Sequence, residues 1–326
     1  MQEASAASEI IKKKILENFF PYLKLFMPVQ SNFLTHIYKR YQCLDSGNIV
    51  LHFAKETHQA ILRKKDYDLN YDLSFEKFWQ NHSEVTTQHS AIINIAKNID
   101  IPKETARRKL GELIKQKVLS KKKNKINWLP TDEYQKDYNI AVADEIRQLA
   151  KLTHFITSMT NLSFSIDEIE NEYKKKFSFY WFHYLDLQLK WMKLWKAQTK
   201  DLEVAMLYIQ IGAYLTTRSN EIVTHDELFS NPDIIKRPNS KNMNVSLSAT
   251  SLSDITGIPR ATCIRKLNLM ASRKIVSQDE NSKRYFINPD SLGKKGVSKE
   301  IVEKLQGLFS EFYLIVIRAL ISKNSN

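Results

Sequence analysis

The residues best suited to chemistry in this chain lie in two similar basic segments. The first reads IPKETARRKL at 101–110 and the second reads IPRATCIRKL at 258–267, with Ile, Pro, Thr, Arg, Lys and Leu at the same spacing. Arginine and lysine side chains donate hydrogen bonds to phosphate oxygens and to the edges of nucleic-acid bases. The segments therefore indicate recognition of a polyanion, repeated after 157 residues (258 minus 101).

The excess positive charge of the chain gathers around these two segments. The 326 residues carry a formal net charge of +13. Residues 102–125 hold ten basic and two acidic side chains, and residues 259–284 hold seven and two, which gives +8 and +5. The charges of the two windows sum to the whole net charge. A polyanionic partner requires this kind of locally concentrated positive charge. A solvated basic face of a soluble protein is the simpler alternative.

Each basic segment is expected to form the second helix of a helix-turn-helix. Apolar residues at helical spacing precede it, at Ile92, Ile95, Ala96 and Ile99 in the first copy and at Leu252 and Ile255 in the second. Pro102 and Pro259 suit the first position of the longer helix, because proline has no N–H to leave unpaired there. The residue before a proline is moved out of the α region, which separates the two helices. We call the two longer helices the basic helices.

A short β-hairpin is expected after each basic helix. In the first copy, residues 118–120 lead through a lysine-rich turn into 126–129, with the alternation of a strand. In the second copy, 275–276 enter, 278–282 turn and 284–287 return. A hairpin of this size must pack on the helices to be stable. The pattern predicts two winged helix-turn-helix units.

The repeat extends beyond these units and predicts an internally duplicated, mainly α fold. Basic and apolar residues at 12–25 align with those at 174–187. We predict a first repeat at 1–162 and a second at 163–326, each a helical bundle that carries a winged helix, at about 48–130 and about 202–289. Each repeat is expected to end in an amphipathic helix, at 132–159 and 298–322.

The segment PKETARRKLGELIKQKVL resembles the DNA-reading segment of bacterial winged-helix regulators of the cyclic-AMP-receptor type. The resemblance covers about 40 residues of each half and implies double-stranded DNA as the partner. It places base-reading residues at Lys103, Glu104 and Arg108, and at Arg260, Ala261 and Arg265; we add Arg107 to this group. The sensor of that family is a Gly-rich β-roll, whereas this chain has 7 Gly, so no nucleotide cofactor is carried over.

A second group of side chains is predicted to contact phosphates, which position a protein on DNA without reading sequence. Its members are Thr105, Lys109, Lys121, Lys122, Lys123, Lys125, Thr262, Lys266, Lys283 and Arg284. The two threonines could equally be buried hydroxyls. Ala106, Leu110, Cys263 and Leu267 are expected to face the core.

Other chemistry finds little support in the sequence. Cys43 and Cys263 are the only cysteines and are far apart, which fits a reduced cytosol and gives no disulfide framework. The eight histidines lack the spacing of a zinc site, and no phosphate-cradling glycine loop occurs. We therefore expect no metal, no cofactor and no catalysis. No secretion signal or membrane span is expected either, so the protein is placed in the cytoplasm with the bacterial nucleoid.

Two apolar segments could conceal a sensor or an interface. The aromatic stretch at 177–195 has helical spacing and is interpreted as a core ridge, with a ligand pocket as the alternative. The helix at 298–322 carries a broad apolar stripe that must be covered, either by the equivalent helix at 132–159 or by another copy of the chain. An effector cannot be assigned from these residues.

Three functions are compatible with this pattern. The first is a transcription regulator that acts as a single-chain pseudo-dimer on two adjacent DNA half-sites. The second is a plasmid-type replication initiator, a class that also uses tandem winged helices. The third is a protein-interaction scaffold whose winged helices no longer bind DNA. Because Glu104 and Ala261 occupy equivalent positions, the first two predict unequal half-sites.

Overall fold

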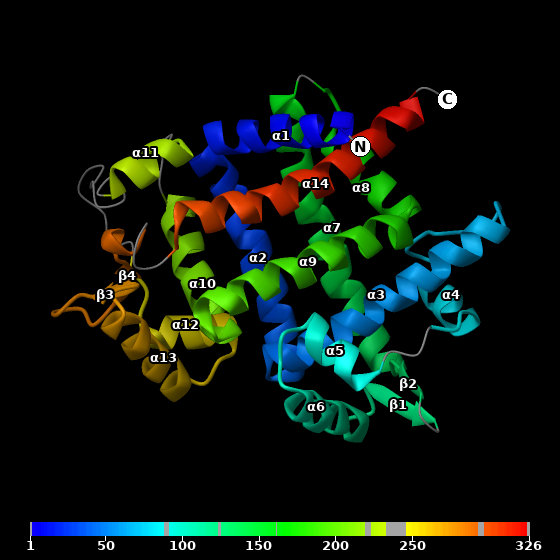
Figure 1. The fold of residues 1–326 in the computed structure, drawn as a ribbon, viewed down its shortest axis with the longest axis horizontal. Helices are drawn as coiled ribbons and strands as arrows, with labels where there is room; N and C mark the ends of the chain where they lie inside the picture. The colour runs from blue at the N-terminus through cyan, green and yellow to red at the C-terminus, as the bar shows by residue number, and fades with distance from the viewer. Residues whose placement is uncertain are drawn as a thin grey trace. The chain divides into compact units, whose positions relative to one another are not determined.

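The computed structural model describes residues 2–87, 91–122, 125–160, 162–218, 223–232, 246–292 and 297–324, and these fold mainly into helices (Figure 1). The chain forms two compact units that are discontinuous in sequence. Unit 1 contains 1–42, 155–162 and 194–314, and unit 2 contains 43–154, 163–193 and 315–326. Three long helices contribute residues to both units: α7 (Asp132–Met159), α9 (Phe177–Thr199) and α14 (Lys299–Asn324).

The two units differ from the consecutive halves 1–162 and 163–326 that the repeat predicts. The N-terminal helices belong with the second helix-hairpin region, because α2 (Phe19–Tyr41) packs along α10 (Leu202–Arg218). The side chain of Met27 fills the space beside Gly212, and the Ser31 hydroxyl donates a hydrogen bond to Gln210. Tertiary packing therefore groups segments that the repeat assigns to different halves.

The described residues of unit 1 form helices and one small sheet. Phe26 of α2 meets Phe309 of α14 edge to face at 4.6 Å, and the Ser8 and Ser310 hydroxyls pair at 3.0 Å. Its remaining elements are α1 (Gln2–Glu17), α11 (His225–Ser230), α12 (Ala249–Thr256), α13 (Arg260–Ser272), β3 (Val276–Gln278), β4 (Tyr285–Ile287) and a 3-10 helix (Pro289–Ser291).

Unit 2 is built around α3 (Leu44–Tyr67), which packs against α9. The His58 ring stacks on Phe78 with 4.6 Å between ring centroids and meets Phe177 edge to face. Lys55 of α3 forms a 3.1 Å ion pair with Asp186 of α9. The other elements of this unit are α4 (Phe78–Glu84), α5 (Ile92–Asn98), α6 (Lys103–Lys115), β1 (Leu119–Lys122), β2 (Lys125–Trp128) and α8 (Ile166–Lys175).

The two apolar segments singled out in the sequence are largely buried. In α9, the residues Phe177, Tyr180, Trp181, Tyr184, Trp191 and Trp195 are all buried, as a core ridge requires. The apolar stripe of α14 is covered at most positions, including Val302, Phe309 and Val316. Within the described residues, α14 is also the one helix whose length and composition would allow a membrane crossing. Half of its most apolar window is buried, and the core helices of soluble proteins can have the same length and composition.

Ionisable groups are enclosed in the core of unit 2. Glu145 of α7 is 3% exposed and accepts a hydrogen bond from the Tyr184 hydroxyl; its burial raises the pKa of the carboxyl to about 8. Burial also lowers the pKa of His58 to about 3 and that of His82 to about 4. The folded protein therefore holds a neutral carboxyl and neutral imidazoles near neutral pH.

We expect Glu145→Gln to make the free energy of unfolding less dependent on pH between about pH 6 and about pH 8. The folded carboxyl titrates near 8 and its unperturbed value is 4.5, so between these values the folded state keeps a proton that the unfolded state loses. Stability contributed by this group is therefore present at acid pH and is lost as the pH rises toward 8. Thermal unfolding measured at about pH 6 and about pH 8 should differ less in the variant than in the parent protein.

The exposed Glu133 supplies the control, since Glu133→Gln removes a carboxyl from the same helix, twelve residues before Glu145, without touching the core. An unchanged pH dependence in Glu145→Gln would contradict the assignment. On the acid side the histidines have the opposite effect, because stability falls as the unfolded imidazoles take up protons below about 6.5.

Candidate nucleic-acid interface

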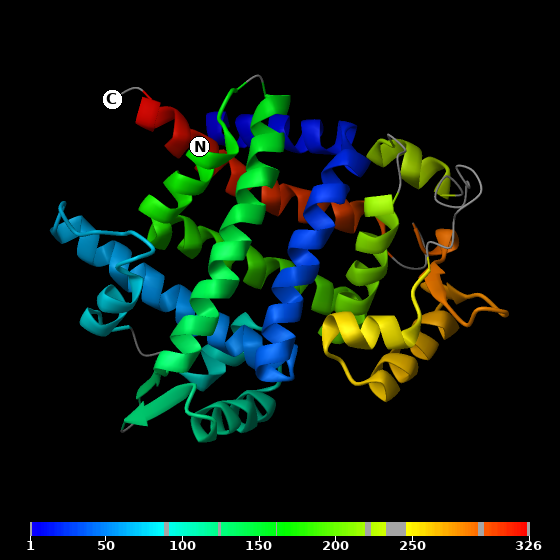
Figure 2. The same ribbon diagram turned by 180° about the vertical axis from the view of Figure 1, so that it is seen from behind.

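The two predicted helix-turn-helix segments have similar local backbones. In unit 2, α5 is followed by α6, and in unit 1, α12 is followed by α13 (Figure 2). The turn between the helices passes through a left-handed residue in both places, Asp100 at φ 55° and Gly257 at φ 77°. The sequence predicts Pro102 and Pro259 at the first helical position of the basic helices α6 and α13. In the structure they are instead the N-cap residues, one position before the first helical residue.

Backbone hydrogen bonds match at positions 157 residues apart. At the start of each basic helix, the N–H of Ala106 donates to Pro102 at 2.9 Å and that of Cys263 donates to Pro259 at 2.9 Å. At the end, Val118 donates to Leu113 and Ile275 donates to Met270. Both helices leave through a left-handed lysine, Lys117 at φ 58° and Lys274 at φ 57°. The backbones are thus alike at both ends of the basic helices. In the turns before them they differ, since the Ile101 amide donates to the Ala96 carbonyl and the Ile258 amide donates to the Thr256 hydroxyl.

Both predicted hairpins form as antiparallel pairs. β1 and β2 pair Leu119 with Trp128, and β3 and β4 pair Val276 with Ile287. In unit 1 the segment before α12 adds an isolated bridge, since Leu247 and Tyr285 exchange two hydrogen bonds of 2.9 Å. In unit 2 Trp128 lies in a cluster of aromatic rings with Phe78, Trp79 and Tyr138. Each hairpin also packs on its own basic helix, β1 on α6 and β3 on α13.

One face of each basic helix is buried. Ala106 and Leu110 of α6 and Cys263 and Leu267 of α13 are all enclosed, which confirms the predicted core positions. The opposite face of each helix is directed to solvent, and its predicted base-reading residues Lys103, Glu104, Arg107, Arg108, Arg260 and Arg265 are all exposed. The sequence pattern therefore identified the exposed face of both helices.

The arginines of α6 form ion pairs within their own helix. Arg107 pairs with Glu104 at 3.0 Å and Arg108 pairs with Glu112 at 2.8 Å. Exposed pairs at this helical spacing contribute only about 0.3–0.5 kcal/mol. The guanidinium groups can therefore exchange these carboxylates for the oxygens of a ligand at small cost.

The exposed face of α13 has a different charge pattern. Arg265 occupies the position of Arg108, but Leu269 occupies that of Glu112, so no carboxylate follows one turn later. Arg260 at the first turn donates from its Nε to the Thr250 hydroxyl of α12 at 3.0 Å. Ala261 is exposed where α6 carries Glu104. The cationic face of α13 is thus less compensated than that of α6.

Two lysines predicted to contact phosphates are instead buried, and the prediction is corrected for them. Lys109 is 7% exposed and donates to the Cys43 sulfur at 2.7 Å. Lys266 is 4% exposed and forms ion pairs with Asp201 and, at 2.9 Å, with Glu203. Burial opposes the charge of Lys266, but the hydrogen bonds to the two carboxylates outweigh it and raise its pKa. Neither ammonium group is placed to reach a phosphate.

Helical periodicity explains why these lysines are buried. Lys109 follows Ala106 by three residues and Lys266 follows Cys263 by three, so each shares the buried face. Both tie the basic helix to the start of an earlier helix in the same unit. Cys43 is the N-cap of α3, and Asp201 accepts hydrogen bonds from the first amides of α10. The composition of the segment indicated charge, whereas its periodicity already indicated burial.

The remaining predicted phosphate contacts are mostly at the hairpin tips. Lys121, Lys122 and Lys125 are exposed on the first hairpin, and Lys123 lies outside the described residues. On the second, Lys283 is exposed, and the half-buried Arg284 donates to the Ser246 carbonyl at 3.4 Å. Thr105 and Thr262 are half-buried, so both alternatives for their hydroxyls stay open.

The part of the chain that the structure describes contains no group of three or more His, Cys, Asp or Glu side chains arranged to hold a metal ion. Cys43 and Cys263 are free thiols, and burial raises the pKa of Cys263 to about 11. Comparison of the chain with protein-family models, with curated proteins and with solved structures finds no significant match. The function is therefore argued from the geometry of the two basic helices.

We expect Lys266→Met to destabilise the protein by about 1–3 kcal/mol, because it leaves two carboxylates near a buried position without their cation. The neighbouring exposed residue Arg265 provides the matched control, and Arg265→Met should change stability by no more than about 0.5 kcal/mol. Chemical denaturation followed by circular dichroism measures both. Equal stabilities for the two variants would show that the ion pairs of Lys266 do not hold α13.

The contact between Lys109 and Cys43 offers a test in which the expected change is stabilising. Cys43→Asp should raise the stability by about 1 kcal/mol, because an aspartate at this N-cap can accept backbone hydrogen bonds and also pair with Lys109. Cys43→Ser supplies the N-cap oxygen without the charge, so the difference between the two variants isolates the pairing with Lys109. A Cys43→Asp protein that melts below the parent would contradict this account of the contact.

Proposed function

We propose that this protein binds double-stranded DNA in a sequence-specific manner and acts as a transcription regulator. In this proposal, α6 and α13 are the recognition helices of two winged helix-turn-helix units that arose by duplication. The observation that carries the proposal is the exposed cationic face found at the same positions of both basic helices, each opposite a buried apolar face.

The order of elements supports the winged-helix interpretation. A short helix, a left-handed turn, a longer helix and an antiparallel hairpin follow one another in each unit. The bridge from Leu247 to Tyr285 adds a third segment to the second hairpin. In proteins of this kind the second helix enters the major groove with its N-terminal residues against the base edges. The hairpin then lies over the phosphate backbone.

The duplication is also supported by structural similarity at equivalent positions where the residues, or the partners they contact, differ. Asp100 and Gly257 differ chemically but share the left-handed conformation 157 residues apart. Lys109 and Lys266 are both buried and both reach the start of an earlier helix, although one meets a thiol and the other two carboxylates. Agreement at such positions favours descent of both units from one ancestor.

The chemistry of the exposed residues suggests how sequence is read. Arg108 and Arg265 have the side chain that binds guanine O6 and N7 with two hydrogen bonds. Glu104 can accept a hydrogen bond from cytosine N4, whereas Ala261 can contact only an apolar group such as the thymine methyl. We therefore infer that a single chain recognises two unequal half-sites, one through each basic helix.

The proposal is tested by selecting duplexes from a random pool with the full chain and measuring binding to the selected sequence by fluorescence anisotropy. Arg108→Ala and Arg265→Ala should each weaken binding to that sequence by about 1–3 kcal/mol and broaden the preference at different positions of the site. Genome-wide immunoprecipitation of the tagged protein then shows whether bound sites lie at promoters or at an array of origin repeats.

The hairpin lysines provide the comparison for the two arginines. Changing Lys121, Lys122 and Lys125 together to Ala should weaken all duplexes alike and lower the slope of log affinity against log salt by about 0.9 for each phosphate that is no longer neutralised. Affinity that does not change with salt would contradict DNA binding altogether. Identical losses on selected and random duplexes in the arginine variants would contradict base reading.

A further inference from the structure

The buried lysine of α6 has a different kind of partner from its counterpart in α13. Lys109 is 7% exposed, and its amine nitrogen lies 2.7 Å from the Cys43 sulfur. The equivalent Lys266 forms ion pairs with two carboxylates. Within the part of the chain that the structure describes, the Cys43 sulfur is the only polar partner of the Lys109 amine. Unit 2 therefore encloses an amine whose one polar contact is an oxidisable atom.

A thiol is a poor partner for a buried ammonium group. Its sulfur is a weak acceptor, whereas a carboxylate offers negative charge as well as lone pairs. Cys43 directly precedes α3 as Asp201 directly precedes α10, so unit 2 has a thiol where unit 1 has a carboxylate. A poorly satisfied buried polar group costs stability, and a redox role is one reason for which such a group is retained. The contact between Lys109 and Cys43 therefore directs attention to its chemistry.

An oxidant can reach the Cys43 sulfur. The residue is half-buried, stands at the N-terminus of α3 and lies beside a lysine. Reactive cysteines occur in partly exposed positions of this kind. Cys263 has the opposite surroundings, since it is fully buried and its burial raises the pKa of the thiol to about 11. The two cysteines of the chain thus differ in their access to an oxidant.

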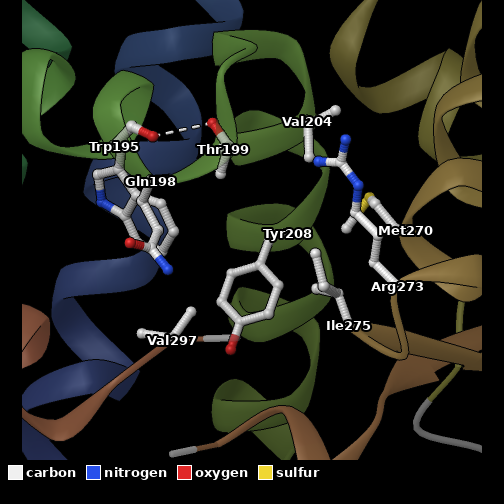
Figure 3. Close-up of a pocket in the computed structure, with 9 residues that line it drawn as sticks. All are labelled: Trp195, Gln198, Thr199, Val204, Tyr208, Met270, Arg273, Ile275 and Val297. Carbon is white, nitrogen blue, oxygen red and sulfur yellow. Dashed lines mark hydrogen bonds between the residues drawn. The ribbon is translucent and has the colours of Figure 1, made fainter. Parts of the chain in front are cut away.

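The sulfur atoms beside α13 have other contacts. The Cys263 thiol donates to the Ile258 carbonyl at 3.4 Å. Met270 lies in the wall of a hollow between α9, α10 and α13, and the side chains that line this hollow include an arginine but no lysine (Figure 3). Among the described residues, neither sulfur forms a hydrogen bond with an amine. The close pairing of sulfur and amine is a feature of α6 and not of α13.

We propose that Cys43 and Lys109 form a redox-sensitive covalent link, a sulfenamide bond between Cys43 Sγ and Lys109 Nζ that closes when hydrogen peroxide oxidises the thiol. The contact already places the two atoms side by side, and the link requires no DNA. The proposal is therefore separate from the function proposed above.

The link forms in two balanced steps. Hydrogen peroxide transfers a hydroxyl group to the sulfur as its O–O bond breaks, which gives a sulfenic acid and one water molecule. The lone pair of the Lys109 nitrogen then attacks the sulfur, the S–N bond forms, the S–O bond breaks and a second water molecule leaves. The sulfur loses two electrons and the peroxide gains two. A protonated amine releases its additional proton to solvent.

Thiols reverse the reaction. A small thiol attacks the sulfur of Cys43, the S–N bond breaks and the amine of Lys109 is restored, which leaves a mixed disulfide on Cys43. A second thiol reduces this disulfide and becomes oxidised in its place. The link therefore closes under oxidising conditions and opens under reducing ones.

The link ties the middle of α6 to the start of α3. It joins residues that are 66 positions apart along the chain, so it restricts the unfolded state as other cross-links of this span do. The oxidised protein should therefore be more stable than the reduced one. The exposed arginines of α6 lie on the opposite face of the helix and stay accessible.

The test exposes the full chain to hydrogen peroxide and follows its intact mass and its peptide map. We expect a loss of about 2 Da, because one hydrogen leaves the sulfur and one leaves the nitrogen, whereas each oxygen added to cysteine or methionine contributes about 16 Da. The map should contain a cross-linked peptide that joins Cys43 to Lys109, and dithiothreitol should release it. Protein that stays unchanged, or that is oxidised without yielding this peptide, overturns the proposal.

A disulfide between Cys43 and Cys263 would cause the same loss of mass, and substitutions distinguish the two. Lys109→Met should abolish the loss and leave Cys43 to gain oxygen, whereas Cys263→Ala should retain it. Lys115→Met is the matched control, because Lys115 is exposed on the same helix and this variant should form the link as the parent does. Melting temperatures establish that each variant is folded. A mass loss that persists in folded Lys109→Met protein overturns the assignment.

The effect on stability has a separate readout. Peroxide should raise the melting temperature of the parent protein, dithiothreitol should return it to the starting value, and the folded Lys109→Met protein should show no such rise. A cross-linked parent that melts at or below the temperature of the reduced protein overturns the stabilising effect of the link on α6.

Discussion

The arrangement of each basic helix depends on the burial of one of its faces. Ala106 and Leu110 in α6, and Cys263 and Leu267 in α13, are packed inside their units, and this fixes the rotation of each helix about its axis. With 3.6 residues per turn, that rotation directs positions 108 and 265 to solvent and positions 109 and 266 to the core. The exposure of the arginines and the burial of the adjacent lysines are therefore two results of one constraint. A buried ammonium then requires a polar partner, which the start of an earlier helix in the same unit supplies, α3 for Lys109 and α10 for Lys266.

The same backbone supports different chemistry in the two units. In unit 1 the buried lysine meets two carboxylates, whereas in unit 2 it meets a thiol. The exposed face of α6 carries two glutamates, and the equivalent positions of α13 carry alanine and leucine. The hairpin of unit 2 has a lysine-rich tip, whereas that of unit 1 also presents Asp279 and Glu280. A ligand bound by both helices would thus meet two non-equivalent surfaces, which distinguishes this chain from a symmetric dimer.

Local features of this fold could be predicted from the sequence, because they depend on residues that are close together along the chain. The repeat at Ile101 and Ile258, the prolines and the alternation after each basic helix located both helices and both hairpins within one or two residues. The grouping of α2 with α10 could not be predicted, since many apolar helices in this chain could satisfy the same buried surface and the choice is made by tertiary packing. For Lys109 and Lys266 the helical periodicity indicated burial, but the positive charge of the two segments led to the prediction of phosphate contacts.

The anchoring of α13 determines how its exposed face is presented. Lys266 is the seventh of the 13 residues of this helix and is fixed by ion pairs to Asp201 and Glu203 at the start of α10. A helix of this length is about 20 Å long, so neither end lies more than about 10 Å along the axis from the anchored lysine. Removing one partner of a buried ion pair is costly, because the remaining charge is left without compensation. The ion pairs of Lys266 therefore position the whole of α13, including the exposed arginines on its opposite face, in addition to contributing to stability.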